Sequence, residues 1–148
     1  MANSTQYAKT VAASPSKIST TELHGRVRVA YADFTADAAQ ETINMFKLPD
    51  GARIIGGRLN HANLGTSTTV SVGHAAYTQA DGTVVALDVD EYKAAASSAS
   101  ATGSAIAATT ALGENSVVDA PEGLVITATT AGANATGLIT VQMTYVLD

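Results

Sequence analysis

The sequence contains no cysteine and no tryptophan, and aromatic residues make up only 5% of its 148 positions. Without cysteine, neither disulfide bonds nor thiolate metal sites can form. The hydrophobic fraction is nevertheless 46%, and alanine supplies much of it. Small side chains bury little area each, and burial stabilises by about 25 cal/mol per Å² of apolar surface. We therefore expect one domain that gains further burial between subunits, as a homo-oligomer.

Positive charge is also scarce. Eight lysines and arginines, scattered along the chain, stand against 13 acidic residues, giving a net charge of −5. Nucleic acids and anionic membranes are bound by clustered cations, so we predict neither as a partner. No stretch approaches the roughly 20 apolar residues of a membrane span, and the first residues lack the apolar core of a secretory leader. We expect a protein made in a cytoplasm and used there, or in a particle assembled there.

No pattern of metal ligands is present. The histidines are His24, His61 and His74. They form no His-x-His or His-Glu-x-x-His spacing, although His61 and His74 could face each other on neighbouring strands. The densest acidic cluster is Asp88, Asp90 and Glu91, which lacks the glycine and distal glutamate of an EF-hand. We interpret it as a solvated strand end or a helix cap, and we predict no metal and no cofactor.

Catalytic motifs are missing as well. The sequence has no Gly-x-Ser-x-Gly elbow and no phosphate-binding loop. The sequence does not exclude a pair of carboxylates that could hydrolyse glycosides. Clefts of that kind are normally lined by aromatic residues, however, and these are few here. We predict that the protein is not an enzyme.

Alternating apolar residues predict strands along most of the chain. The clearest case is 124–147, which predicts two strands paired as a β-hairpin around the small-residue loop 131–137. The first strand is expected over 26–34, in which Val27, Val29 and Tyr31 share a face. Further strands are expected over 53–64, where Gly56 and Gly57 suggest a bulge, and over 68–77 and 83–89. Residues 41–48 fit a strand or a helical turn.

Two segments interrupt this pattern. Residues 90–96 could begin a short helix, followed by a crossover between sheets, and 109–118 could hold one more short strand. The spacing of turns favours an all-β fold, a β-sandwich of jelly-roll type with seven or eight strands. We assign residues 23–148 to this domain. Residues 1–22, rich in Ser, Thr, Ala and Lys, are expected to form an extended N-terminal arm that becomes ordered on binding.

Several motifs resemble those of small structural proteins from the heads of tailed bacteriophages. They are Ser71–His74 (SVGH), Asp88–Ala95 (DVDEYKAA), Gly137–Tyr145 (GLITVQMTY), the phrase Lys47–Gly57 and the N-terminal arm. The resemblance implies a capsid decoration, or cement, protein. Such a β-sandwich sits on the outer surface of the virion shell, often as a trimer, and clamps adjacent subunits of the major capsid protein.

Under this interpretation the arm contacts the capsid. We expect Tyr7 to anchor it and Lys9 and Lys17 to pair with acidic groups, because residues 1–22 have no evident folding role. The alternative function is a tail-fibre or receptor-binding module that recognises host glycans. A small glycosidase or lyase is the third candidate.

Overall fold

The structure is a computed structural model that describes residues 25–37 and 40–147. The predicted arm, with Tyr7, Lys9 and Lys17, lies outside the described residues, as does His24. Within the described ranges the strands are β1 (Val27–Ala36), β2 (Thr42–Leu48), β3 (Arg53–His61), β4 (Thr68–His74), β5 (Tyr77–Thr78), β6 (Val84–Val85), β7 (Asp88–Ser97), β8 (Thr102–Ile106), β9 (Leu124–Gly132) and β10 (Gly137–Val146), with one 3₁₀ turn, η1 (Thr110–Leu112).

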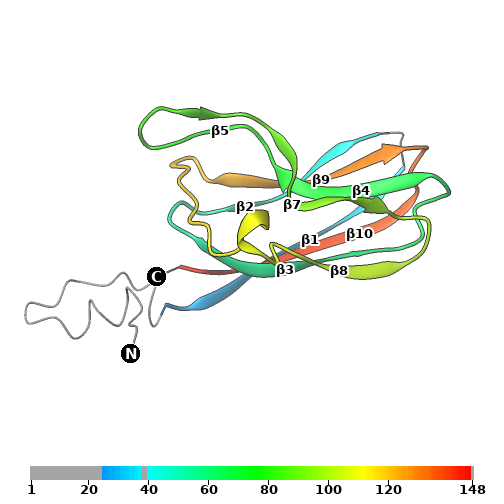
Figure 1. Cartoon of the computed structure of the whole chain (residues 1–148), viewed down its shortest axis with the longest axis horizontal. Helices are drawn as coiled ribbons and strands as arrows, with labels where there is room; N and C mark the ends of the chain where they lie inside the picture. The colour runs from blue at the N-terminus through cyan, green and yellow to red at the C-terminus, as the bar shows by residue number, and fades with distance from the viewer. Residues whose placement is uncertain (1–24, 38–39, 148) are drawn as a thin grey trace, which may run out of the picture.

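Eight of these strands form two four-stranded antiparallel sheets packed face to face (Figure 1). Their orders are β1-β10-β3-β8 and β2-β9-β4-β7, while β5 and β6 pair as a separate hairpin that projects from the sandwich. Every connection between sandwich strands passes from one sheet to the other, except the one from β4 to β7 that carries the hairpin. Two sheets interleaved in this way make a jelly roll, which confirms the predicted fold class.

The core lies between the two sheets and is built mainly from aliphatic side chains. Its largest fully buried members are Leu48, Ile54, Leu59, Leu64, Ile106, Ile126, Ile139 and Met143. In β10 the expected alternation is present, since Ile139, Val141 and Met143 are fully buried and the residues between them are not. Among the described residues Tyr92 is the only aromatic member of the buried hydrophobic core.

The predicted hairpin between the last two strands is wrong. β9 pairs with β2 and β4, whereas β10 pairs with β1 and β3 in the opposite sheet. The loop that joins them therefore crosses the sandwich edge, with Ala135 buried and the Thr136 N–H donating to the Leu64 carbonyl at 2.9 Å. In β9 and β10 alternation identifies the buried positions but not the neighbouring strand, so a hairpin and a crossover give the same local pattern.

The predicted helix at 90–96 is also wrong, because these residues belong to strand β7. Pairing with β4, including Lys93 opposite Val72, outweighs the helix preference of the alanines. The predicted crossover between sheets follows directly after β7. There Ser98 is fully buried, its N–H donating to the Thr68 carbonyl at 3.0 Å and its hydroxyl lying 2.8 Å from the Thr68 hydroxyl.

The remaining local predictions are partly correct. Residues 41–48 adopt the strand alternative as β2, and the ladder between β3 and β10 shifts register opposite Ile54 and Gly56, where a bulge was expected. Within 83–89 only Val84 and Val85 form a strand before β7 begins. The segment 109–118 contains η1 and a single bridge between Val117 and Arg53 in place of a strand.

Gly73 in β4 allows β7 to approach closely. A Cβ at this position would overlap the backbone of Asp88 and Val89, so we expect Gly73→Ala to cost about 1–3 kcal/mol of unfolding free energy. A Cβ at the strand residue Gly103 would meet only the side-chain ends of Asn60 and Arg58, which can move. Urea unfolding should therefore show a clearly smaller loss for Gly103→Ala. Equal losses would contradict this account of Gly73.

Candidate functional site

Three features of the described residues are candidates for a functional site. They are a depression at one end of the sandwich, a cluster of His and Tyr side chains beside β4, and an exposed apolar stripe on β1. The residues predicted to bind the capsid, Tyr7, Lys9 and Lys17, lie outside the described part of the chain. Their contribution stays a prediction.

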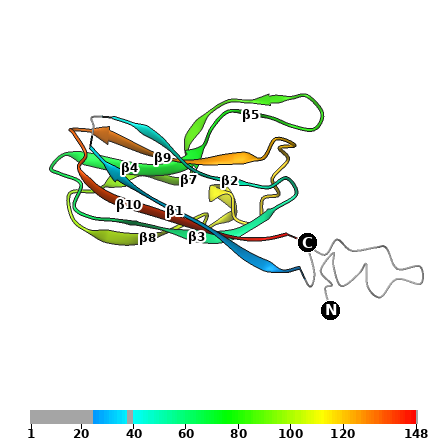
Figure 2. The same cartoon turned by 180° about the vertical axis from the view of Figure 1, so that it is seen from behind.

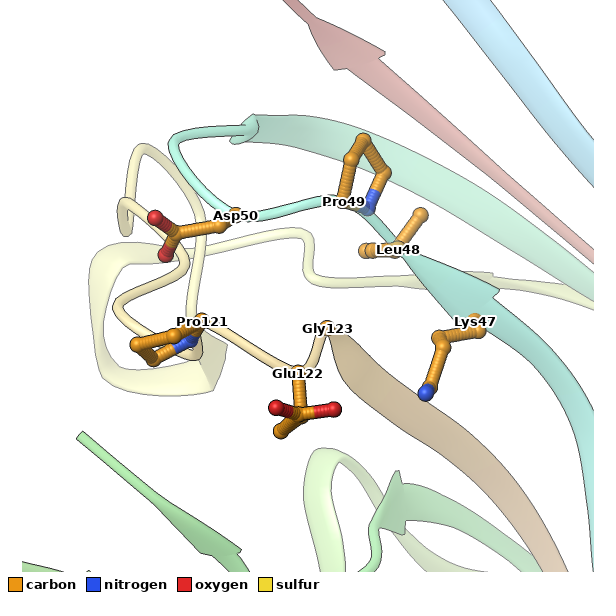
Figure 3. A pocket seen from close by; sticks show the side chains of 7 residues that line it. All are labelled: Lys47, Leu48, Pro49, Asp50, Pro121, Glu122 and Gly123. Carbon is orange, nitrogen blue, oxygen red and sulfur yellow. The ribbon is translucent and has the colours of Figure 1, made fainter. Parts of the chain in front are cut away.

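The depression has a volume of about 350 Å³ and is open to solvent (Figure 3). Its walls are the segment 47–50 at the end of β2 and the turn 121–123 before β9. The Ala120 N–H donates to the Asp50 carboxylate at 2.8 Å, and the Gly51 N–H donates to the Val118 carbonyl at 2.9 Å. These bonds fix the two loops against each other, so the depression is a product of loop packing.

The chemistry of this depression is limited. Its lining contains Lys47, Asp50 and Glu122 as charged residues, and no Ser, Thr, His or aromatic residue. Figure 3 shows Asp50 and Glu122 on separate loops. The lining offers neither a nucleophile with an adjacent base nor an aromatic platform for a sugar ring. We assign no reaction to it.

The second candidate surrounds His74, which is only 6% exposed at the end of β4. Its ring meets Tyr77 and Tyr92 edge to face, with centroid separations of 5.3 and 6.2 Å. Its Nδ1 lies 2.9 Å from the Ala75 carbonyl oxygen. The backbone therefore occupies Nδ1 of the His74 ring, and the three rings pack together where Tyr92 joins the core and Tyr77 lies against it.

Burial affects the ionisation of both tyrosines in this cluster. It raises the pKa of Tyr92 above the usual range, with a further contribution from the nearby Glu91 carboxylate. Burial also raises the pKa of Tyr77, assisted by the negative charges of Asp119 and Glu91. The folded protein therefore favours neutral tyrosines here, as expected for packing residues.

The two described histidines do not face each other. His61 ends β3 and His74 ends β4, and these strands belong to different sheets. The Nδ1 of His61 lies 2.8 Å from the Ala62 carbonyl oxygen, so each ring contacts its own neighbouring backbone. The possibility of a facing pair, which the sequence left open, is wrong because the turn between β3 and β4 is a crossover.

The acidic cluster forms a strand end, one of the two predicted alternatives. Asp88 begins β7, and its carboxylate accepts the Asp90 N–H at 3.0 Å. This backbone bond lowers the pKa of the Asp88 carboxyl, and the nearby His74 adds to the effect. In the described part of the chain no group of three or more His, Asp or Glu side chains is arranged to hold a metal ion.

The third candidate is a stripe of apolar side chains on β1, which we call the β1 stripe: Val27, Val29 and Tyr31. Their exposed fractions are 64%, 61% and 60%. The opposite face of the strand carries Ala30 and Phe34, which pack against the core. The sequence predicted that the three residues share a face, but that face points to solvent. The sequence contained a hint of this, because the small residues Ala30 and Ala32 alternate with the stripe and suit a core rich in small side chains.

Comparisons with known proteins agree with the fold. No protein-family model matches the chain, and no curated protein matches it significantly in sequence. Among solved structures it is similar to a chain in the capsid of Ralstonia phage GP4 (TM-score 0.60, 21% identity, 84% of this chain and 86% of that one). It is also similar to a chain in the capsid asymmetric unit of cyanophage Pam1 (0.56, 22%, 84% and 86%).

A third similar chain comes from the acidic stable capsid of Helicobacter pylori bacteriophage KHP30 (TM-score 0.56, 18% identity, 82% of this chain and 87% of that one). At these identities the likeness shows a shared fold. Since most of both chains is covered in each case, the three are similar to this protein in size as well as in architecture. Separately, the described residues include no helix with the length and apolarity needed to cross a membrane.

The raised pKa of Tyr92 predicts a pH effect on stability. Above about pH 10 the unfolded chain loses this proton while the folded state keeps it, so stability falls as pH rises. Tyr92→Phe removes this ionisation and should make the loss between pH 10 and 11 smaller by about 1 kcal/mol. Tyr77→Phe should have a smaller effect because Tyr77 is less buried. Unfolding curves at both pH values test this, and an unchanged pH dependence in Tyr92→Phe would refute it.

Proposed function

We propose that this protein is a structural component of a bacteriophage capsid, and that it acts as a decoration protein on the outer surface of the major capsid lattice. The observation that carries the proposal is the similarity over most of its length to single chains in three phage capsids, at TM-scores of 0.56–0.60. Because 86–87% of each of those chains is covered, the likeness is to whole small chains and not to one domain of a large one.

The geometry supports a role that depends on contact area. The two sheets pack their inner faces against each other, and the described residues bring no nucleophile and base together in the end depression. The negative net charge and scattered cations suit binding to protein better than binding to packaged nucleic acid. We therefore propose the major capsid protein as the partner and the capsid surface of the virion as the location, with no catalytic activity.

The proposal includes self-association. The small-residue core leaves a monomer with modest burial, and the resemblance of its motifs implies a trimer. A receptor-binding module remains the competing function, but aromatic platforms for sugars are scarce on this chain. Aromatic residues are only 5% of the sequence, and the buried one, Tyr92, is unavailable to a ligand.

A decoration protein should stabilise the shell in proportion to its occupancy, because it binds the assembled lattice and not the dissociated subunits. We expect particles that carry the protein to survive a higher temperature or a stronger osmotic shock than particles from which it is absent. DNA release measured by dye fluorescence during heating provides the readout. Adsorption to host cells, measured in parallel, should be the same for both kinds of particle.

The opposite pair of results would contradict the proposal. Equal shell survival together with lost adsorption would assign the protein to receptor binding. Adding back the purified protein supplies the control, since restored shell survival must follow its binding to the particles.

The arm gives a separate prediction. Deleting residues 2–20 should leave the fold intact and weaken binding to capsids, because an extended segment adds contact area without supporting the sandwich. Replacing Tyr7, Lys9 and Lys17 with alanine should have the same direction of effect. Lys47→Ala, which removes one exposed lysine from β2, serves as a control for charge. Co-sedimentation with capsids measures binding, and unchanged affinity of the deletion variant would exclude the arm as the anchor.

A further inference from the structure

The β5–β6 hairpin, residues 75–87, projects from the sandwich (Figure 2). It is inserted between β4 and β7, and within the described residues its two strands pair only with each other. Figures 1 and 2 both show it at the end of the sandwich where β1 begins and β10 ends. The predicted arm precedes residue 25, so it joins the domain at the same end as the hairpin.

Contacts with the rest of the domain hold the hairpin in place. Its base is the pair of His74 and Asp88, and Tyr77 packs edge to face on the His74 ring at a centroid separation of 5.3 Å. Further out, the Ala80 N–H donates to the Asp119 carboxylate at 3.1 Å. A two-stranded hairpin is at best marginally stable by itself. These contacts therefore make it a fixed projection of the domain.

The two sides of the hairpin differ in exposure. Tyr77 and Val85 lie opposite each other in the ladder and are half-buried, and Tyr77 packs against the core. The next pair, Thr78 and Val84, faces the other way, and Val84 is 73% exposed. Leu87, where the chain returns to β7, is 51% exposed. Apolar side chains presented on a fixed element lose little conformational freedom when they are buried against a partner.

The charges around these apolar side chains are all of one sign. From residue 75 to residue 92 the sequence has no lysine or arginine, and its acidic residues are Asp81, Asp88, Asp90 and Glu91. The exposed Asp119 beside the hairpin adds a further negative charge. A complementary partner therefore carries cations around the site that receives the hairpin. A second copy does not fit, because it presents the same acidic hairpin and like charges across an interface are unfavourable.

We propose that the hairpin docks into an apolar recess, bordered by lysine or arginine side chains, on a subunit of the major capsid protein. Val84 and Leu87 fill the recess, and the acidic residues pair with the cations at its border. This inference rests on the proposed function and names the part of the sandwich that makes the contact. Because the arm leaves from the same end, hairpin and arm can bind one capsid face together, which raises the combined affinity.

The first test compares the same substitution at two exposed leucines. Leu138, on β10, is 46% exposed and lies opposite Thr35 near the end of β1, away from the hairpin. Leu87→Asp should bind capsids about ten-fold more weakly than the unmodified protein, because it buries a carboxylate in an apolar contact. Leu138→Asp should bind as the unmodified protein does. Co-sedimentation with capsids measures both affinities.

The second test concerns charge. Asp81→Asn removes a negative charge but keeps a side-chain oxygen that can accept the Thr83 N–H, which the carboxylate accepts at 2.8 Å. This variant should bind capsids several-fold more weakly at low salt and almost equally well at high salt, because salt screens exposed charges. Asp33→Asn, which removes an exposed carboxylate from β1, should leave the affinity unchanged at both salt concentrations.

A third measurement does not depend on the stability of the aspartate variants. The natural sequence has no cysteine, so Leu87→Cys introduces a single thiol. Labelling of this thiol by a bulky maleimide should be several-fold slower with capsids in excess than without them. The thiol of Leu138→Cys should be labelled at the same rate in both conditions.

Two results would overturn the inference alone while the unmodified protein still binds and stabilises shells. They are an unchanged affinity of Leu87→Asp and a Leu87→Cys thiol labelled equally fast with and without capsids. Other occupants would also overturn it. Labelling of the free protein that becomes faster when residues 2–20 are deleted would identify the arm, and labelling that slows with protein concentration would identify a second copy. An unmodified protein that does not bind capsids would remove the proposed function together with the inference.

Discussion

Pairing between β1 and β10 is the interaction on which the rest of the structure depends. It joins the two ends of the described chain, from Val27 opposite Val146 to Ala36 opposite Gly137. β10 also pairs with β3, so it occupies the interior of its sheet and connects the first strand to the third. Because strands alternate between sheets, neither sheet is complete until nearly the whole chain is in place. Such non-local pairing is costly in chain entropy and is maintained by burial of the inner faces.

The core shows how a chain with few large side chains can support this arrangement. Gly57 and Gly73 sit where a Cβ would collide with neighbouring strands, and alanines such as Ala128 are fully buried. Small residues let the backbones approach closely and keep packing dense, but each contributes little buried area. Large apolar side chains that stay exposed therefore mark surfaces suited to burial against a partner. Three of them, Val27, Val29 and Tyr31, lie on the outer face of the edge strand β1.

The candidate site was only partly accessible from the sequence. Alternation showed that Val27, Val29 and Tyr31 share a face, but a strand pattern does not say which face of an edge strand meets the core. Of the two interpretations of the acidic cluster, the strand end is correct and the helix cap is wrong, since Asp88 begins β7 and its carboxylate accepts the Asp90 N–H. The histidines could not be placed, because their relation depends on whether the turn between β3 and β4 closes a hairpin or crosses between sheets. The end depression, formed by loops from distant segments, had no sequence signal.

The sequence by itself determined that the fold is all-β, that the final segment forms two strands with defined buried positions, and that the chain crosses between sheets within residues 90–112. These properties depend on local alternation and turn chemistry, which act over a few residues. Only the tertiary structure decided which strands are neighbours: it separated β9 from β10, made residues 90–96 part of β7, and turned the β1 stripe outward. The physical reason is that pairing partners are selected by burial across the whole sandwich, and that selection joins residues more than a hundred positions apart.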